Sequence, residues 1–190
     1  MTETHELIKR ILAGETAAFR SLILAYQRLV SHIVFRMVSN AADREDLCQD
    51  VFIKVYQNLG GFQFESKIST WIAKIAYNTC INYLKKKKVP LYDDLTATEE
   101  SIENKFSGDD SSDAFALSSD INSRLQQEIA KLPVQYRTIL TLYHLDEMSY
   151  AEISEVLGMP DGTVKNYLFR ARKLLKDRLN SKYQVEELWQ

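Results

Sequence analysis

Apolar side chains recur at steps of three and four residues along most of this chain, which is the spacing of one face of an α-helix. Residues 16–39 carry the longest such run. Two more runs follow over about 42–59 and 69–87; the first ends at a pair of glycines and the second before Pro90. Glycine and proline both stop helices. The sequence therefore predicts a group of helices in residues 1–88.

The second part of the chain has a different layout of helices. Ser149 and Glu152 have the spacing of a capping box, which marks the start of a helix, and Gly158 follows as a turn before Asp161 caps a final helix. A short helix, a glycine-containing turn and a longer basic helix form a helix-turn-helix. The helices predicted here cover about 121–132, 135–145, 149–157 and 161–180.

Residues 89–120 differ from both flanking parts. They hold six serines and nine acidic residues, with no sustained apolar period, which is typical of a flexible tether. The predicted fold class is therefore all-α: two small helical domains joined by a flexible acidic linker, the C-terminal one a helix-turn-helix. The predicted boundaries are 1–88, 89–120 and 121–190, and a length of 190 residues accommodates two small domains.

The net charge of −2 hides an uneven distribution. Residues 1–88 hold 13 Lys and Arg against 8 Asp and Glu, whereas the linker holds 1 against 9. Residues 161–182, which include the last predicted helix, hold 7 basic and 2 acidic residues. An acidic middle thus separates two basic ends, and basic ends of this kind favour a nucleic-acid partner.

Catalytic and metal-binding patterns are missing from the sequence. The three histidines are scattered, and no nucleophile motif, phosphate-binding loop or metal-ligand spacing appears, so we expect neither an enzyme nor a cofactor. Cys48 and Cys80 lie beside apolar helical positions, which favours core packing in a reducing cytoplasm. We predict neither a signal peptide nor a membrane span, because no apolar run approaches about 20 residues.

The final predicted helix has two unlike faces. Its apolar stripe runs from Val164 to Leu179, and the opposite face is basic with Phe169 near its centre. A major groove offers acceptors to Lys and Arg and thymine methyl groups to an apolar ring, so we favour a DNA-reading helix over a solvated basic face with a stray aromatic. The residues of the polar face are Lys165, Asn166, Phe169, Arg170, Arg172, Lys173 and Lys176.

Two surfaces of the N-terminal part leave open alternatives. Around the start of the third helix, aromatic rings alternate with amides and lysines, a mixture that suits unstacked bases; periodicity alone slightly favours the alternative that Trp71 and two phenylalanines pack between helices. The second surface lies on the second predicted helix, where Ile53 is surrounded by Asp43, Asp46 and Asp50. An exposed apolar residue among acids suits a protein partner, and a plain solvated face is the alternative.

Three motifs in this order resemble the sigma-70 family. Residues 46–56, DLCQDVFIKVY, resemble its polymerase-binding helix, and residues 69–78, STWIAKIAYN, resemble its promoter-melting helix. Leu132-Pro133 followed by residues 149–153, SYAEI, and 162–165, GTVK, is similar to its C-terminal helix-turn-helix. The resemblance covers about 15–88 and 121–178, and the two-domain layout resembles the extracytoplasmic-function (ECF) group.

The resemblance implies a role for each of three residue sets. The clamp helices of the largest subunit of core RNA polymerase would be bound by Asp46, Gln49, Asp50, Ile53 and Lys54. The non-template strand of the minus-ten element would be captured by Phe62, Phe64, Glu65, Ser66, Lys67, Trp71, Lys74, Asn78 and Asn82. The minus-thirty-five duplex would be read by Lys165, Asn166, Phe169, Arg170 and Lys173. The loop 63–66 is variable in the family, so the selected base stays open.

The resemblance implies an ECF sigma factor, with promoter DNA, core polymerase and an anti-sigma factor as partners. The main alternative is a stand-alone helix-turn-helix regulator, which would leave Trp71, Asn78, Asn82 and the polymerase-like helix unexplained. A helical signalling adaptor is a further alternative, and polymerase binding would separate it from a sigma factor.

Overall fold

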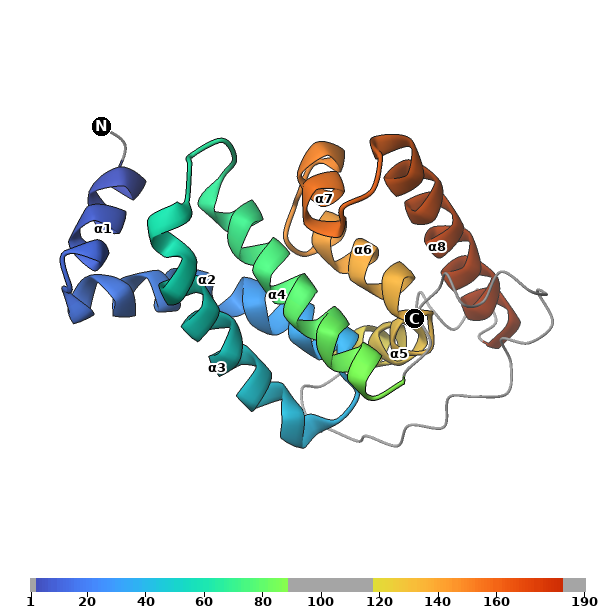
Figure 1. Ribbon diagram of the computed structural model, residues 1–190. Coiled ribbons are helices and arrows are strands. Elements are labelled where there is room, and N and C mark those ends of the chain that lie inside the picture. Colours follow the sequence, from blue (N-terminus) through green and yellow to red (C-terminus); the bar gives the residue numbers. More distant parts are fainter. Residues whose placement is uncertain (1–2, 89–117, 183–190) are drawn as a thin grey trace.

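The computed structural model describes residues 3–88 and 118–182, and within these ranges every regular element is a helix (Figure 1). The predicted all-α class is confirmed. Most of the expected linker, 89–120, lies outside the described residues. Its last three residues are the exception, because they begin a helix at Ser118.

The N-terminal half contains four α-helices and one short 3-10 turn. The predicted helices at 16–39, 42–59 and 69–87 are confirmed to within two residues, whereas residues 3–12 form an additional helix that the periodicity analysis missed. Asn40 caps the third helix by accepting a hydrogen bond from the Ala42 amide at 3.0 Å. The elements are α1 (Glu3–Leu12), α2 (Thr16–Met37), α3 (Ala41–Asn58), η1 (Leu59–Gly61) and α4 (Ile68–Lys86).

The C-terminal half contains the helix-turn-helix. The capping box at Ser149 is formed in both directions, and Gly158 ends the short helix with a left-handed φ of 67°, a conformation that glycine adopts without steric cost. Asp161 is the first residue of the last helix rather than its cap. The elements are α5 (Ser118–Ala130), α6 (Val134–His144), α7 (Tyr150–Leu157) and α8 (Asp161–Lys182).

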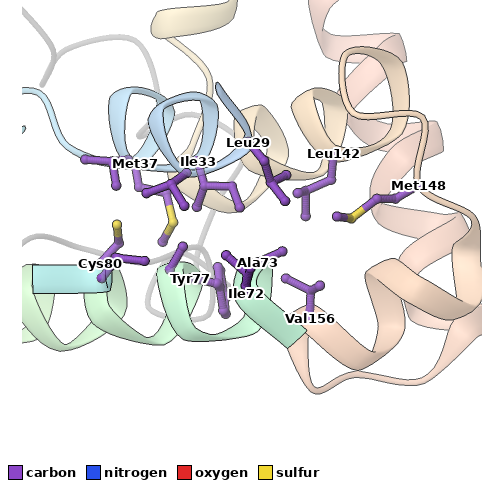
Figure 2. Close-up of a cluster of buried hydrophobic side chains, with 14 of the residues drawn as sticks. Leu29, Ile33, Met37, Ile72, Ala73, Tyr77, Cys80, Leu142, Met148 and Val156 are labelled. Atoms are coloured by element: carbon purple, nitrogen blue, oxygen red, sulfur yellow. The ribbon is translucent and has the colours of Figure 1, made fainter. Parts of the chain in front are cut away.

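The two halves share one hydrophobic core, and the sequence had left their relative placement open. Helix α2 packs against α6, and α4 packs against α7. Figure 2 shows side chains of both halves meeting in one cluster, and the labelled members are buried. The cluster includes Leu29, Ile33 and Met37 from α2, Ile72, Ala73, Tyr77 and Cys80 from α4, and Leu142, Met148 and Val156 from the C-terminal half.

Polar contacts also cross between the halves. The buried Arg137 guanidinium donates to the carbonyl of Met37 at 3.2 Å and to that of Ala130 at 2.7 Å. Burial, with help from nearby arginines, lowers the pKa of Arg137 to about 10. His32 Nδ1 lies 2.8 Å from a carboxylate oxygen of Asp146, whose pKa burial raises. These contacts fix α2 against α6 and the loop that follows it.

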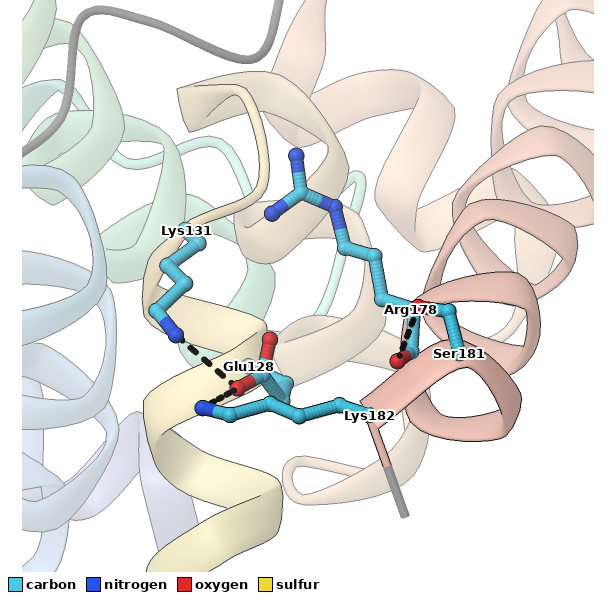
Figure 3. Close-up of polar contacts among 5 residues, drawn as sticks. All are labelled: Glu128, Lys131, Arg178, Ser181 and Lys182. Carbon is cyan, nitrogen blue, oxygen red and sulfur yellow. Dashed lines mark hydrogen bonds and ion pairs between the residues drawn. The ribbon is translucent and has the colours of Figure 1, made fainter. Parts of the chain in front are cut away.

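The two ends of the C-terminal half are tied by Glu128. Its carboxylate accepts from Lys131 at 2.9 Å and from Lys182 at 2.8 Å, so that α5 is held to the last turn of α8 (Figure 3). Burial opposes ionisation of this carboxylate, but the two lysines outweigh it, and the pKa of Glu128 lies below its ordinary value. The contact orients the long helix that carries the basic face.

Candidate nucleic-acid and partner surfaces

The loop between η1 and α4 is built on a chain of aromatic rings. Phe62 is only 8% exposed, and its ring lies 4.7 Å from that of Phe64 and 5.3 Å from that of half-buried Trp71, measured between centroids. Phe64 itself is 39% exposed and has a φ of 59°. Phe62 thus supports the loop from below, whereas Phe64 presents part of its ring at the surface. The alternative that aromatics pack between helices holds for Phe62 and for part of Trp71.

A residue that the sequence analysis did not select completes this ring chain. His5, near the start of α1, stacks on Phe64 with ring centroids 3.6 Å apart and planes 13° apart. No periodicity marked residue 5, because a single half-buried ring carries no pattern of its own. Only the fold brings α1 beside the loop, through its packing on α2 and η1.

Helix α4 presents polar side chains on the face away from the core. Lys74, Asn78 and Asn82 are exposed, as their spacing predicts, while Ile72 and Ala76 are buried on the other face. Lysine can hold phosphates, and amides can read base edges. The exposed residues continue the surface that begins at the loop, where Glu65 is exposed and Ser66 half-buried.

Helix α3 carries a second surface of different chemistry. Ile53 is 53% exposed, and Asp46, Gln49 and Asp50 are exposed on the same helix. Lys54 behaves differently: it is half-buried, and its ammonium donates to the Thr79 hydroxyl at 3.1 Å. This lysine therefore joins α3 to α4, and four of the five residues predicted for partner binding present themselves to solvent.

Helix α8 has the two faces that its sequence predicted. Val164, Leu168 and Ala171 are buried, whereas Lys165, Asn166, Phe169, Arg170 and Lys173 are all exposed. Phe169 is 68% exposed, so burial does not explain an aromatic ring at this point. Tyr167 is half-buried, with its ring edge-on to that of Tyr136, so this side chain packs on the domain and does not extend the basic face. The face combines cations, an amide and one apolar ring.

One ion pair connects the ring-lined loop to the helix-turn-helix. The ammonium of Lys67 lies 2.9 Å from Glu152, the residue that closes the capping box of α7. The hydrogen bond from Lys67, with further bonds from Ser149, overcomes partial burial and lowers the pKa of Glu152 to about 2. Lys67 is therefore neutralised by a carboxylate in this arrangement of the two halves.

The described residues offer neither a metal site nor a membrane-spanning helix. Among the residues that the structure describes, no group of three or more His, Cys, Asp or Glu side chains is arranged to hold a metal ion. No helix in the same part of the chain is long and apolar enough to cross a bilayer. Cys80 is buried and Cys48 half-buried, and burial raises the pKa of both thiols, which agrees with their predicted packing role.

The chain is similar to known proteins over most of its length. The family model for Sigma-70 region 2 matches residues 22–89, and that for Sigma-70, region 4 matches residues 122–175. The ECF RNA polymerase sigma factor SigW of Bacillus subtilis is 33% identical over 180 residues, covering 90% of this chain and 94% of the relative. The ECF RNA polymerase sigma-E factor of Escherichia coli is 34% identical, covering 91% and 92%.

Solved structures share the fold. CnrH in complex with the cytosolic domain of CnrY is 20% identical with a TM-score of 0.65, covering 93% of this chain and 97% of that chain. The sigma factor RpoE of Bartonella quintana, in complex with the anti-sigma factor NepR, is 21% identical with a TM-score of 0.64, covering 87% and 98%. At this level of identity the likeness concerns the fold alone.

Proposed function

The chain belongs to the extracytoplasmic-function sigma factors of the sigma-70 family, and we propose that it binds core RNA polymerase and directs it to specific promoters. The role is non-enzymatic and is carried out in the cytoplasm, where transcription takes place in bacteria. The observation that carries the proposal is that a single chain exposes both a ring-lined loop suited to unstacked bases and a cationic helix-turn-helix suited to duplex DNA.

The proposed division of the chain follows these surfaces. Residues 1–88 bind polymerase and recognise and melt the minus-ten element, residues 121–190 recognise the minus-thirty-five element, and residues 89–120 link them. The matches of region 2 and region 4 to separate parts of the chain support this division. The shared core between the halves means that promoter binding at two separated elements requires them to move apart, since one turn of B-DNA spans about 34 Å.

Polymerase binding is assigned to the exposed surface of α3. Asp46, Gln49, Asp50 and Ile53 contact the clamp helices of the largest subunit, with the isoleucine as the apolar anchor and the carboxylates as the charged rim. Lys54 was also expected to contact polymerase. Its hydrogen bond to Thr79 supports a different role, which is to hold α3 against α4.

Minus-ten capture is assigned to the loop and the outer face of α4. Phe64 and the exposed part of Trp71 stack with unpaired bases, Asn78 and Asn82 read base edges, and Lys67 and Lys74 hold phosphates, while Phe62 supports the rings. Lys67 takes part once it leaves Glu152. Glu65 and Ser66 lie in the variable stretch of the loop and contribute to the choice of base.

Minus-thirty-five reading is assigned to α8. Arg170, Lys165 and Lys173 supply donors for guanine and for phosphates, Asn166 supplies an amide for base edges, and Phe169 contacts thymine methyl groups. The ammonium of Lys165 lies 5.5 Å from the centre of the Tyr150 ring, so α7 restricts this side chain. We also propose an anti-sigma factor as a partner, because a sigma factor of the same fold is solved with one.

The polymerase assignment is tested with Asp50→Lys combined with Ile53→Ser, assayed by binding to core polymerase. Both side chains are exposed, so helicity should be unchanged while affinity falls at least tenfold, the loss expected of an interface anchor. Asn58→Lys is the control, because Asn58 is exposed on the same helix but lies about 140° round the axis from Ile53. Unchanged affinity in the double variant would remove α3 from the interface.

A further inference from the structure

The ring of His5 lies flat on that of Phe64, at a distance at which the two rings are in van der Waals contact. Phe64 belongs to the loop assigned to base capture, whereas α1 lies outside residues 22–89, the part matched to Sigma-70 region 2. Parallel contact of two planar rings is also the arrangement in which an unstacked base lies on an aromatic side chain. His5 thus occupies a place of the kind that a base would take.

Packing of α1 on the rest of the fold holds His5 in position beside Phe64. Ile8 and Ile11 are buried, and α1 packs against both α2 and η1. His5 lies one turn before Ile8, where the helix reaches the loop, and its side chain is only half-buried. The packed helix therefore positions the imidazole of His5 against the loop, and the ring itself stays partly exposed to solvent.

Phe64 is held in an uncommon conformation at this contact. A φ of 59° is left-handed, which is rare for a bulky residue and persists only where neighbours determine it. Phe62 contacts the ring at a tilt of 56° and His5 covers it at 13°. A base inserted between His5 and Phe64 would need about twice their present separation of 3.6 Å. The histidine and a base therefore exclude each other from this face of Phe64.

We propose that His5 is an intramolecular stand-in for a captured base. Imidazole is a planar heterocycle with one N–H donor and one acceptor nitrogen when neutral, and it has the form of the five-membered ring of a purine. It covers Phe64 until an unpaired base displaces it. The apparent affinity for a single strand is then reduced by the fraction of chains in which His5 is stacked. This inference rests on the proposed role of the loop.

The test measures binding of the full chain to a fluorescein-labelled single strand of random sequence, about 12 nucleotides long, by fluorescence anisotropy. His5→Ala should bind about two- to tenfold more tightly than the unchanged chain, the range that corresponds to losing one aromatic stack. His5→Phe, which keeps a ring, should show no such gain. His5→Gln, which keeps polarity without a ring, should repeat the gain, and circular dichroism checks that each variant folds.

The same measurement in a Phe64→Ala background separates the two proposals. There the gain from His5→Ala should vanish, since no stacking face is left to uncover. Equal or weaker binding by His5→Ala and His5→Gln in the otherwise unchanged chain would overturn the stand-in role, as would a gain that persists without Phe64. If Phe64→Ala binds single strands as tightly as intact Phe64 when both chains also carry His5→Ala, the assignment of the loop to base capture fails.

Discussion

At the scale of single residues, Glu152 has two functions that a substitution can separate. It closes the capping box of α7, and it forms an ion pair with Lys67 of the ring-lined loop between η1 and α4. The capping box accepts glutamine as well as glutamate at this place, whereas the ion pair needs the charge. The ring-lined loop and the helix-turn-helix are therefore connected through one removable carboxylate charge.

Glu152→Gln should raise the affinity of the free chain for single-stranded DNA, because Lys67 is released to a phosphate while α7 keeps its cap. The increase should be modest, about two- to threefold, and should shrink as salt is added, since it comes from one surface charge. Anisotropy titrations at several salt concentrations measure it. In a Lys67→Gln background the same change should have no effect, and an equal gain there would refute the link.

The same carboxylate makes a prediction about pH. The pKa of Glu152 falls from 4.5 to about 2 in the folded chain, so ionised Glu152 stabilises the fold at pH values above 4.5, and this contribution disappears as pH falls through about 2. The stability difference between the unchanged chain and Glu152→Gln should be constant above pH 4.5 and decline below it. Urea unfolding across this range measures the difference, and one that grows on acidification would contradict the pairing.

At the scale of elements, periodicity predicted each helix that carries a proposed contact, because each has one buried face. The exposed Phe169 and Ile53 were also found this way, as apolar exceptions on polar faces. Helix α1 also has one buried face, with Ile8 and Ile11 at helical spacing, but no helix was predicted there. Periodicity could not find the hydrogen bond from Lys54 to Thr79, since a long flexible side chain can reach a neighbour from a half-exposed place. Phe62 was placed among the base-capturing residues by the resemblance, whereas periodicity favoured packing, and the buried ring agrees with periodicity.

The two DNA surfaces should act at different steps of initiation. Arg170→Ala should weaken closed-promoter binding, by about 1–3 kcal/mol if the arginine makes a bidentate guanine contact. Trp71→Ala should leave duplex binding nearly intact and block strand opening, because the faces of bases become reachable only after melting. Permanganate footprinting on matched and premelted templates separates the two steps.

Premelting should partly restore the Trp71→Ala variant and should not restore upstream selection in Arg170→Ala. Trp71 also packs on Phe62, so Trp71→Phe is included as a variant that keeps a ring against the loop. Failure of Arg170→Ala and Trp71→Ala at the same step would show that the loop and α8 do not divide duplex from single-strand recognition.

At the scale of the whole molecule, the two halves pack on one shared core, and we expect them to unfold as one cooperative unit. Leu142 of α6 is fully buried in the cluster that also contains Ile33 of α2 and Ile72 of α4. The sequence could not reveal this packing, because the same apolar stripes also serve within each half, and contacts between residues far apart in the sequence leave no local pattern.

Leu142→Ala should lower the free energy of unfolding by about 2–5 kcal/mol, and it should destabilise the helices on both sides of the shared core. Hydrogen exchange should show protection falling in α2 and α4 as well as in α6, because local openings follow cooperative units. A loss confined to α5–α8 would show that the halves unfold independently.

The central claim is that this chain directs RNA polymerase to a particular set of promoters. The most direct measurement is to mix the purified chain with core polymerase and genomic DNA and to sequence the 5′ ends of the transcripts. We expect start sites that depend on the chain and share two upstream elements, with the set shifting when Arg170 or Phe64 is replaced. Start sites identical to those made by core polymerase alone would contradict the claim.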